Sequence, residues 1–173
     1  MNAQLFPTLT AQSCQKGDYL QAMAHAVTGV GIVATDGPAG RMGITVSSMA
    51  SVSAEPPLLL VCLRADSPSA AAVAANGRFS LSLLHQGQDA LADTFAGRPR
   101  TGDAYAFSAA TWVQAPGELP RVAAASATFI CEVVSAQPVG SHLLLIGQVT
   151  GCSHEDSLPL LYCARQYGMP VAL

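Results

Sequence analysis

Runs of apolar and β-branched residues, separated by turn signals, predict that strands make up most of this chain. The segments 29–35 (GVGIVAT) and 43–47 (GITVS) are rich in such residues, and the turn-forming DGPAG stands between them. This arrangement predicts a β-hairpin over residues 30–47. The segment 56–63 (PPLLLVCL) is apolar throughout, which favours a strand that is buried on both faces.

Three further segments follow the strand pattern. Apolar and polar residues alternate over 78–84 (RFSLSLL). Longer strand patterns cover 121–136 and 142–153, and the sequence AQPVGS separates them. Strands that follow one another in hairpins favour antiparallel pairing, so we expect about six or seven strands in an antiparallel barrel.

Two segments of lower β propensity have a helical pattern. Residues 17–27 (GDYLQAMAHAV) place apolar side chains at helical spacing, and 85–97 (HQGQDALADTFAG) predicts a helix that ends at its last glycine. Residues 98–120 contain three prolines and two glycines, which indicates a loop.

The segment 67–76 (SPSAAAVAAN) has the clearest helix boundaries in the chain. Ser67 is a suitable N-cap, Pro68 follows at the first helical position, and Asn76-Gly77 supplies the stop. With no linker or repeat in the sequence, we expect a single domain over residues 1–173. The chain has no GxGxxG after a strand and no GxxxxGK[ST], which argues against the Rossmann and P-loop modes of phosphate binding.

The composition is oily for a soluble monomer. Half of the residues are hydrophobic and only 11% are charged, so some apolar surface should stay exposed unless a partner covers it. We therefore expect a homodimer, with an alanine-rich composition of no further meaning as the alternative. The formal net charge is -3 and Lys16 is the single lysine, which disfavours nucleic-acid binding.

The cysteines and histidines show no metal-binding spacing. No CxxC is present, and no histidine pair has a carboxylate partner at ligand spacing, so we predict no metal. The scattered cysteines fit reduced thiols in a cytoplasm. The N-terminal MNAQLFPTLT lacks the features of a signal peptide, and the apolar runs are too short to span a membrane. The five cysteines are Cys14, Cys62, Cys131, Cys152 and Cys163.

A cluster of hydroxyl side chains directly precedes the apolar run at 56–63. Hydroxyls and backbone N–H groups in an extended loop can bind a planar heterocycle or a phosphate without adding charge. Alternatively, they are ordinary strand and turn residues that bond to their own backbone. The cluster consists of Thr45, Ser47, Ser48, Ser51 and Ser53.

Seven blocks of sequence cover most of the chain: TGVGIVATDG (28–37), GITVSSMASVSAEPPLLLVCL (43–63), SPSAAAVAANGRFSLSLL (67–84), ADTFAG (92–97), ATFICEV (127–133), GSHLLLIGQV (140–149) and PLLY (159–162). In their order and spacing they resemble the flavin reductase family, small NAD(P)H:flavin oxidoreductases. The resemblance implies a mainly β, antiparallel FMN-binding split barrel with a few short flanking helices. It also implies that FMN or FAD binds non-covalently and is reduced by NADH or NADPH.

The same resemblance implies that the flavin ring and ribityl chain lie against two neighbouring strand ends. The segment 45–48 matches the family segment that borders the ring and ribityl chain, and Ser51 lies on the same expected loop. The end of the 56–63 strand also touches the flavin. The implied contacts are Thr45, Val46, Ser47, Ser48, Ser51, Cys62 and Leu63.

It further implies a phosphate site at the start of the 67–76 helix. Ser67 and Ser69 match family positions near the phosphate, and a helix N-terminus offers free N–H groups to an anion. Arg64 can add a charge-assisted hydrogen bond. The alternatives are an ordinary N-cap for Ser67 and a solvated strand-end charge for Arg64. Phe95 matches another contact in the family, or is a core aromatic.

A histidine motif suggests the nicotinamide site. The family has Gly-Asp-His, with the histidine beside the nicotinamide, where this chain has Gly140-Ser141-His142. The missing aspartate removes the carboxylate that would orient the imidazole. His142 is still the candidate catalytic residue, with a turn-capping histidine as the alternative. Tyr162 and Tyr167 match the family's region near the pyridine nucleotide, or pack at a dimer interface.

Under this resemblance we expect the reductase component of a two-component monooxygenase. Hydride transfer between the cofactors needs no protein nucleophile. The reduced flavin would pass to a separate oxygenase that hydroxylates or epoxidises an aromatic substrate. Two alternatives are a non-catalytic split barrel that binds flavin or haem, and a structural dimeric barrel without a ligand.

Overall fold

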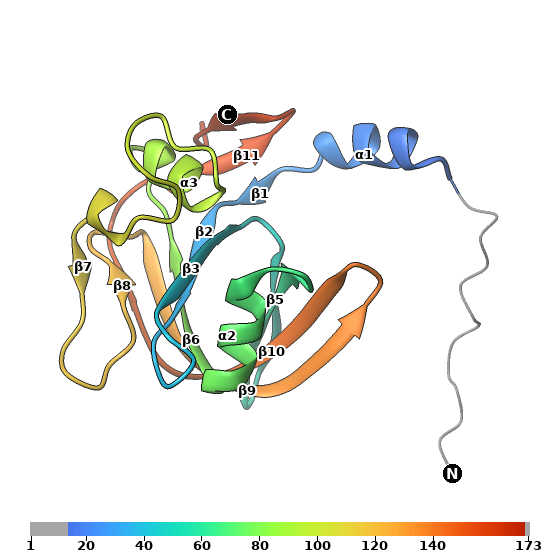
Figure 1. Cartoon of the computed structure of the whole chain (residues 1–173). Coiled ribbons are helices and arrows are strands. Elements are labelled where there is room, and N and C mark those ends of the chain that lie inside the picture. Colours follow the sequence, from blue (N-terminus) through green and yellow to red (C-terminus); the bar gives the residue numbers. More distant parts are fainter. Residues whose placement is uncertain (1–13, 172–173) are drawn as a thin grey trace, which may run out of the picture.

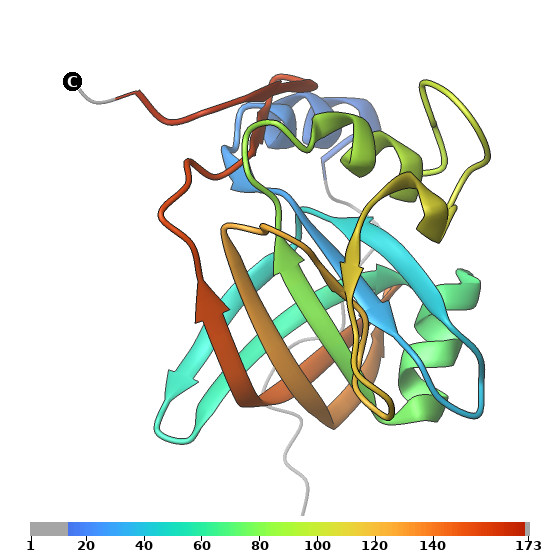
Figure 2. The same ribbon diagram turned by 90° about the vertical axis from the view of Figure 1, so that its left-hand side faces the viewer.

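The computed structural model describes residues 14–171, and one seven-stranded antiparallel sheet forms the body of the protein (Figure 1). The strands follow the order β3–β2–β6–β9–β10–β5–β4, and the sheet curls into a barrel (Figure 2). This architecture confirms the predicted mainly β, antiparallel fold. The strands are β2 (Gly31–Thr35), β3 (Met42–Val46), β4 (Met49–Ala54), β5 (Pro57–Arg64), β6 (Arg78–Leu83), β9 (Ala127–Val139) and β10 (His142–His154).

Two small sheets and four short helices surround the barrel. The small sheets have the orders β1–β11–β12 and β7–β8. Their strands are β1 (Thr28–Gly29), β7 (Trp112–Val113), β8 (Arg121–Val122), β11 (Leu161–Cys163) and β12 (Gln166–Gly168). The helices are α1 (Lys16–Ala24), α2 (Pro68–Asn76), α3 (Asp89–Phe95) and the 3₁₀ helix η1 (Phe107–Ala109).

The barrel is split between β3 and β4, which are the two edge strands of the sheet. These strands are consecutive in the chain, and only Ser47 and Ser48 connect them. The chain itself therefore crosses the opening, and the described pairings include no ladder between the two edges. Because β3 pairs with β2 alone, alternate residues of β3 direct their backbone N–H and C=O groups toward the opening.

Two apolar cores bury β2 on both faces. Val33 belongs to the core inside the barrel, against which α2 packs Ala70 and Val73. Ile32 and Ala34 belong to an outer core, which α3 and the β7–β8 sheet help to form. The two helices therefore lie close to the split edge, where they can contribute to a site.

The apolar run PPLLLVCL forms β5, but the prediction of burial on both faces is wrong. Leu59, Val61 and Leu63 are buried in the barrel core, whereas Leu60 and Cys62 between them are only half-buried. The helices pack elsewhere, mainly α2 against β2, β3 and β6, and α3 against β2 and β3. The outer face of β5 consequently keeps an apolar surface that the helices leave uncovered.

The predicted helix at 67–76 is confirmed together with its boundaries. Ser67 is the N-cap, and its Oγ accepts a hydrogen bond from Ala70 N–H at 3.1 Å. Pro68 occupies the first turn, and Gly77 ends the helix with a φ of 69°. These signals are local, which explains why they can be read from the sequence.

The other two helices are shorter than predicted. α1 ends at Ala24, and none of its residues is buried. The helix lies away from the barrel (Figure 1), and its side chains Tyr19, Leu20 and Met23 are exposed. α3 starts at Asp89, because the preceding residues form a turn in which His85 N–H donates to Gln88 Oε1.

The strand predictions need three corrections. Residues 49–54, expected to be a loop, form edge strand β4. The predicted strand 121–136 is two strands, β8 and β9, separated by a turn in which Ala124 has a φ of 56°. The predicted loop 98–120 contains η1 and β7.

The sequence MNAQLFPTLT, in which we expect no signal peptide, lies outside the described residues. In residues 14–171, no helix has the length and apolar character that crossing a membrane requires.

Gly147 of β10 permits a close approach of the barrel core to the backbone. A Cβ there would lie 2.8 Å from Cys131 Cβ and 2.8 Å from the Phe79 ring, both fully buried. We expect Gly147→Ala to lower the free energy of unfolding by about 1–3 kcal/mol through overpacking. Gly151→Ala on the same strand is the control, since its Cβ would meet nothing closer than 3.9 Å. Urea denaturation of both variants checks this, and equal stabilities would contradict it.

Candidate functional site

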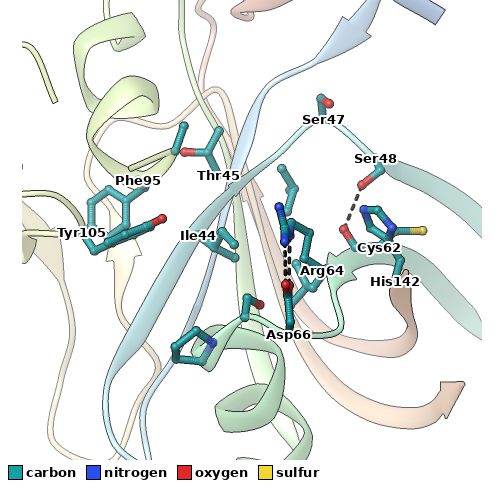
Figure 3. Close-up of a pocket in the computed structure, with 15 residues that line it drawn as sticks. Ile44, Thr45, Ser47, Ser48, Cys62, Arg64, Asp66, Phe95, Tyr105 and His142 are labelled. Atoms are coloured by element: carbon teal, nitrogen blue, oxygen red, sulfur yellow. Dashed lines mark hydrogen bonds and ion pairs between the residues drawn. The ribbon is translucent and has the colours of Figure 1, made fainter. Parts of the chain in front are cut away.

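A cleft of about 520 Å³ opens at the split of the barrel. Its walls come from β3, the Ser47–Ser48 link, the end of β5, the start of α2 and the end of α3 (Figure 3). Ten of the predicted site residues line this cleft: Thr45, Val46, Ser47, Ser48, Cys62, Leu63, Arg64, Ser67, Phe95 and His142. The fold thus brings together residues that are far apart in the sequence.

The three hydroxyls at the end of β3 have different partners. Thr45 Oγ1 donates to the Ala92 carbonyl of α3 at 2.7 Å. Ser48 Oγ donates to the Cys62 carbonyl at 2.9 Å, and Cys62 N–H donates back to the Ser48 carbonyl at 3.1 Å. The Ser47 hydroxyl has no protein hydrogen-bond partner within the described residues, so it is available to a ligand. The alternative that these hydroxyls only form hydrogen bonds with the protein backbone therefore holds for Thr45 and Ser48, but not for Ser47.

This part of the cleft carries no charge. Val46 and Leu63 are buried in the barrel core and contribute an apolar floor. Burial raises the pKa of the Cys62 thiol, so Cys62 stays neutral at neutral pH. We call Thr45, Ser47, Ser48 and Cys62, with the backbone between them, the polar shelf. An uncharged shelf suits a neutral planar ligand with hydrogen-bonding edges.

Arg64 is already paired with an acidic residue that the sequence analysis missed. Asp66 accepts hydrogen bonds from Arg64 Nε at 3.0 Å and Nη2 at 2.6 Å, and both side chains are exposed. The hydrogen bond from Arg64 holds the pKa of Asp66 below its ordinary value. The pair places opposite charges at the cleft and leaves little net charge there.

The start of α2 lies at the same end of the cleft. Ser67 lines the cleft while it caps the helix, so its N-cap role is established and a second role remains compatible with its position. Ser69 lies outside the cleft, because it is buried and its Oγ donates to the Gly43 carbonyl at 3.3 Å. Phe95 is fully buried among Phe107 and Trp112, and also lines the cleft.

His142 begins β10 directly opposite Arg64 of β5. The Ser141 hydroxyl lies 2.9 Å from His142 Nδ1, so this serine supplies a polar partner where the family motif has aspartate. With Nδ1 engaged, Nε2 is the ring nitrogen available to a ligand. Gly140 lies in the preceding turn with a φ of 57° and does not line the cleft.

Tyr162 and Tyr167 line a smaller cavity of about 140 Å³, which shares Thr45 and Ser47 with the cleft. Both rings pack against the outer core of their own chain. Tyr167 OH donates to Asp93 Oδ1 at 2.8 Å. Burial, followed by this hydrogen bond, raises the pKa of Tyr167 well above its usual range, so it remains a donor that fixes α3.

Ser51 lies on β4, opposite Leu59, and does not line the cleft. Residues 49–54 form a strand instead of the expected loop, and this strand places Ser51 outside the cleft. Conversely, Tyr105 lines the cleft although nothing in its sequence context marks it. Its N–H donates to the Thr94 carbonyl at 3.0 Å, which holds the loop against α3. The cleft-lining residues that the sequence analysis missed are Ile44, Asp66, Pro68, Ala96 and Tyr105.

Within the described residues, no three His, Cys, Asp or Glu side chains are arranged to hold a metal ion.

Comparison with known proteins gives a consistent family match. A family model described as "Flavin reductase like domain" matches residues 23–169. A curated relative, the FMN reductase (NADH) RutF of Ancylobacter novellus, is 37% identical over 158 residues, which is 91% of this chain and 86% of the relative.

Solved structures share both the fold and part of the sequence. The styrene monooxygenase flavin reductase (SMOB) of Pseudomonas putida S12 matches with a TM-score of 0.78 and 32% identity, covering 90% of this chain and 99% of that one. The NADH:FAD oxidoreductase SgcE6 of Streptomyces globisporus C-1027 matches with a TM-score of 0.82 and 25% identity. The match covers 96% of this chain and 99% of that one.

Proposed function

The chain belongs to the flavin reductase family, and from this membership we propose that it is an NADH-dependent oxidoreductase that reduces FMN or FAD. We further propose that it supplies the reduced flavin to a separate monooxygenase that acts on an aromatic substrate. One observation carries the proposal most directly. The uncharged polar shelf, His142 and the N-terminus of α2 all line one cleft.

The residues of the cleft fit a flavin. Its volume of about 520 Å³ falls within the roughly 300–1,000 Å³ that small-molecule pockets occupy. The Ser47 hydroxyl and the unpaired edge of β3 would bind the polar edge of the ring, with Val46 and Leu63 beneath it. The N–H groups at the start of α2, with Ser67, would bind the phosphate.

The bound cofactors supply the redox chemistry, in which a hydride passes from the nicotinamide to the flavin. The chain would hold the two rings in contact and exclude water from between them. His142 would hydrogen-bond the nicotinamide through Nε2, and Ser141 would fix the imidazole through Nδ1. Tyr162 and Tyr167 would border the neighbouring part of the dinucleotide. No nucleophile or strong acid is required of the chain.

Flavin exchange is compatible with the charges of the cleft. Arg64, the cation in its lining, is compensated by Asp66, so attraction for the flavin phosphate is modest. Modest affinity suits a flavin that binds, is reduced and leaves. The relation of SMOB to styrene monooxygenase supports, by analogy, transfer to a separate oxygenase.

Steady-state oxidation of NADH, with FMN or FAD added, tests the proposed activity. We expect oxidation to depend on the added flavin, and to produce free reduced flavin that a separate oxygenase can use. Flavin binding without NADH oxidation would favour a non-catalytic flavin-binding barrel, and binding of haem alone would favour a haem protein. Failure to quench flavin fluorescence would favour a structural barrel.

We also propose that the protein is a homodimer. α1 exposes Tyr19, Leu20 and Met23, each about half exposed. Half-buried Leu60 and Ile146 lie opposite each other on the outer face of β5 and β10. Contact with a second copy would bury these apolar surfaces. Light scattering should report twice the chain mass, and a monomer at micromolar concentration would contradict the proposal.

His142→Ala should raise the KM for NADH about two- to tenfold, which corresponds to the loss of one hydrogen bond of about 0.5–1.5 kcal/mol. The KM for flavin should change less than twofold, because the flavin contacts lie on β3, β5 and α2. His154→Ala, at the far end of β10, is the matched control. An unchanged KM for NADH would exclude this role for His142.

Asp66→Asn should strengthen FMN binding about two- to fivefold, because it frees Arg64 and removes a negative charge near the phosphate. Since Arg64 keeps the pKa of Asp66 low, the carboxylate is charged at neutral pH and the effect should appear there. Riboflavin, which lacks the phosphate, should bind equally to both proteins. Asp156→Asn, on an exposed loop, is the control. Fluorescence titration of the wild type and both variants with FMN and riboflavin measures these affinities, and weaker FMN binding by Asp66→Asn would place the phosphate elsewhere.

A further inference from the structure

A second cavity, of about 280 Å³, adjoins the cleft at the start of α2. It shares Ile44, Ser67, Pro68 and Tyr105 with the cleft, so the two spaces meet beside the proposed phosphate position. Its remaining walls include Arg41, Met42 and Phe107. We call this second cavity the side pocket.

The side pocket combines apolar walls with one cation. The Arg41 guanidinium carbon lies 4.2 Å from the centre of the Phe107 ring and 5.9 Å from that of Trp112, as in a cation–π contact. Arg41 forms no ion pair in the described part of the chain, whereas Arg64 and Arg100 are paired with carboxylates. The charge of Arg41 therefore remains available to an anion.

These features suit an aromatic base joined to a phosphate. Aromatic rings and the arginine plane offer stacking surfaces for a base, and a guanidinium binds a phosphate by charge-assisted hydrogen bonds. The volume lies near the lower bound of about 300 Å³ for small-molecule pockets, so it accommodates part of a ligand rather than a second flavin.

We infer that the side pocket binds the adenosine 5′-phosphate half of FAD, an inference that rests on the proposed flavin site. FMN ends at the phosphate that we assign to the start of α2. FAD continues from that phosphate through a second phosphate to ribose and adenine, and the side pocket opens where this continuation begins. Arg41 would contact the second phosphate, and the base would lie between Tyr105, Phe107 and Pro68.

NADH contains the same adenosine phosphate group, and its chemistry would suit the pocket equally. The position of the pocket favours FAD. His142, the proposed nicotinamide contact, does not line the side pocket, whereas Ser67 and Pro68 at the proposed flavin phosphate do. A measurement of flavin binding in the absence of NADH distinguishes FAD from NADH as the molecule whose adenosine phosphate group occupies the pocket.

The experiment is a fluorescence titration of the full chain with FMN and FAD in the absence of NADH. We expect the wild type to bind FAD more tightly than FMN. Arg41→Gln should weaken FAD binding about tenfold and change FMN binding less than twofold. Arg165→Gln, an exposed arginine of the β11–β12 turn, is the charge-matched control and should change neither affinity.

A second variant tests the pocket without removing the charge. Met42→Trp should fill the side pocket, lower FAD affinity and preserve FMN affinity, with circular dichroism confirming that both variants fold. Equal loss of FMN and FAD affinity, or no loss of either, would overturn the inference and leave the proposed function intact. A raised KM for NADH with FMN as acceptor, at unchanged FAD affinity, would assign the pocket to NADH and overturn it too. Failure of the wild type to bind either flavin would overturn the proposed function itself.

Discussion

The absence of hydrogen-bond pairing between β3 and β4 is the feature on which the site depends. In a closed barrel, the backbone groups of both strands would satisfy one another. Here the chain crosses from one sheet edge to the other through Ser47 and Ser48, and β3 keeps one unpaired edge. Such an edge must be covered or paired with something else, because exposed strand edges invite association. The proposed flavin would supply that pairing, so the opening in the sheet and the proposed binding site are one structural feature.

The position of α3 relative to this edge is maintained by polar contacts as well as by the outer core. Thr45 of β3 donates to the Ala92 carbonyl, and Tyr167 donates to Asp93. Arg100 pairs with both Asp89 and Asp93, which ties the following loop to the helix. Together these contacts join β3, the β11–β12 hairpin and the loop that carries Tyr105. A change in any one of them would alter the wall of the cleft without touching a ligand.

An element of the fold could be predicted from the sequence where the residues that determine it lie close together in the chain. The boundaries of α2 follow from Ser67, Pro68 and Gly77, whose effects do not depend on distant residues, and they were predicted correctly. β4 was missed because its alanines have low β propensity and its serines are typical of turns, although apolar and polar residues alternate over residues 50–54. The half-exposed face of β5 could not be foreseen, because burial depends on which helices cover the sheet. The single domain over 1–173 and the homodimer stay predictions.

The candidate site also contains some residues that could be predicted from the sequence and others that could not. The family resemblance identified ten cleft residues, because order and spacing along the chain carry that information. Ser51, Ser69 and Gly140 lie outside the cleft, since a strand, a buried hydrogen bond and a turn direct them elsewhere. Asp66, whose carboxylate pairs with Arg64, keeps the net charge of the cleft small. A reductase that releases its product must bind oxidised and reduced flavin with similar affinity. Both forms carry the same phosphate, so an unpaired Arg64 beside that phosphate would retain the flavin in either oxidation state. The carboxylate of Asp66 cancels that attraction, and any additional affinity can then come from groups that do not change charge during the reaction.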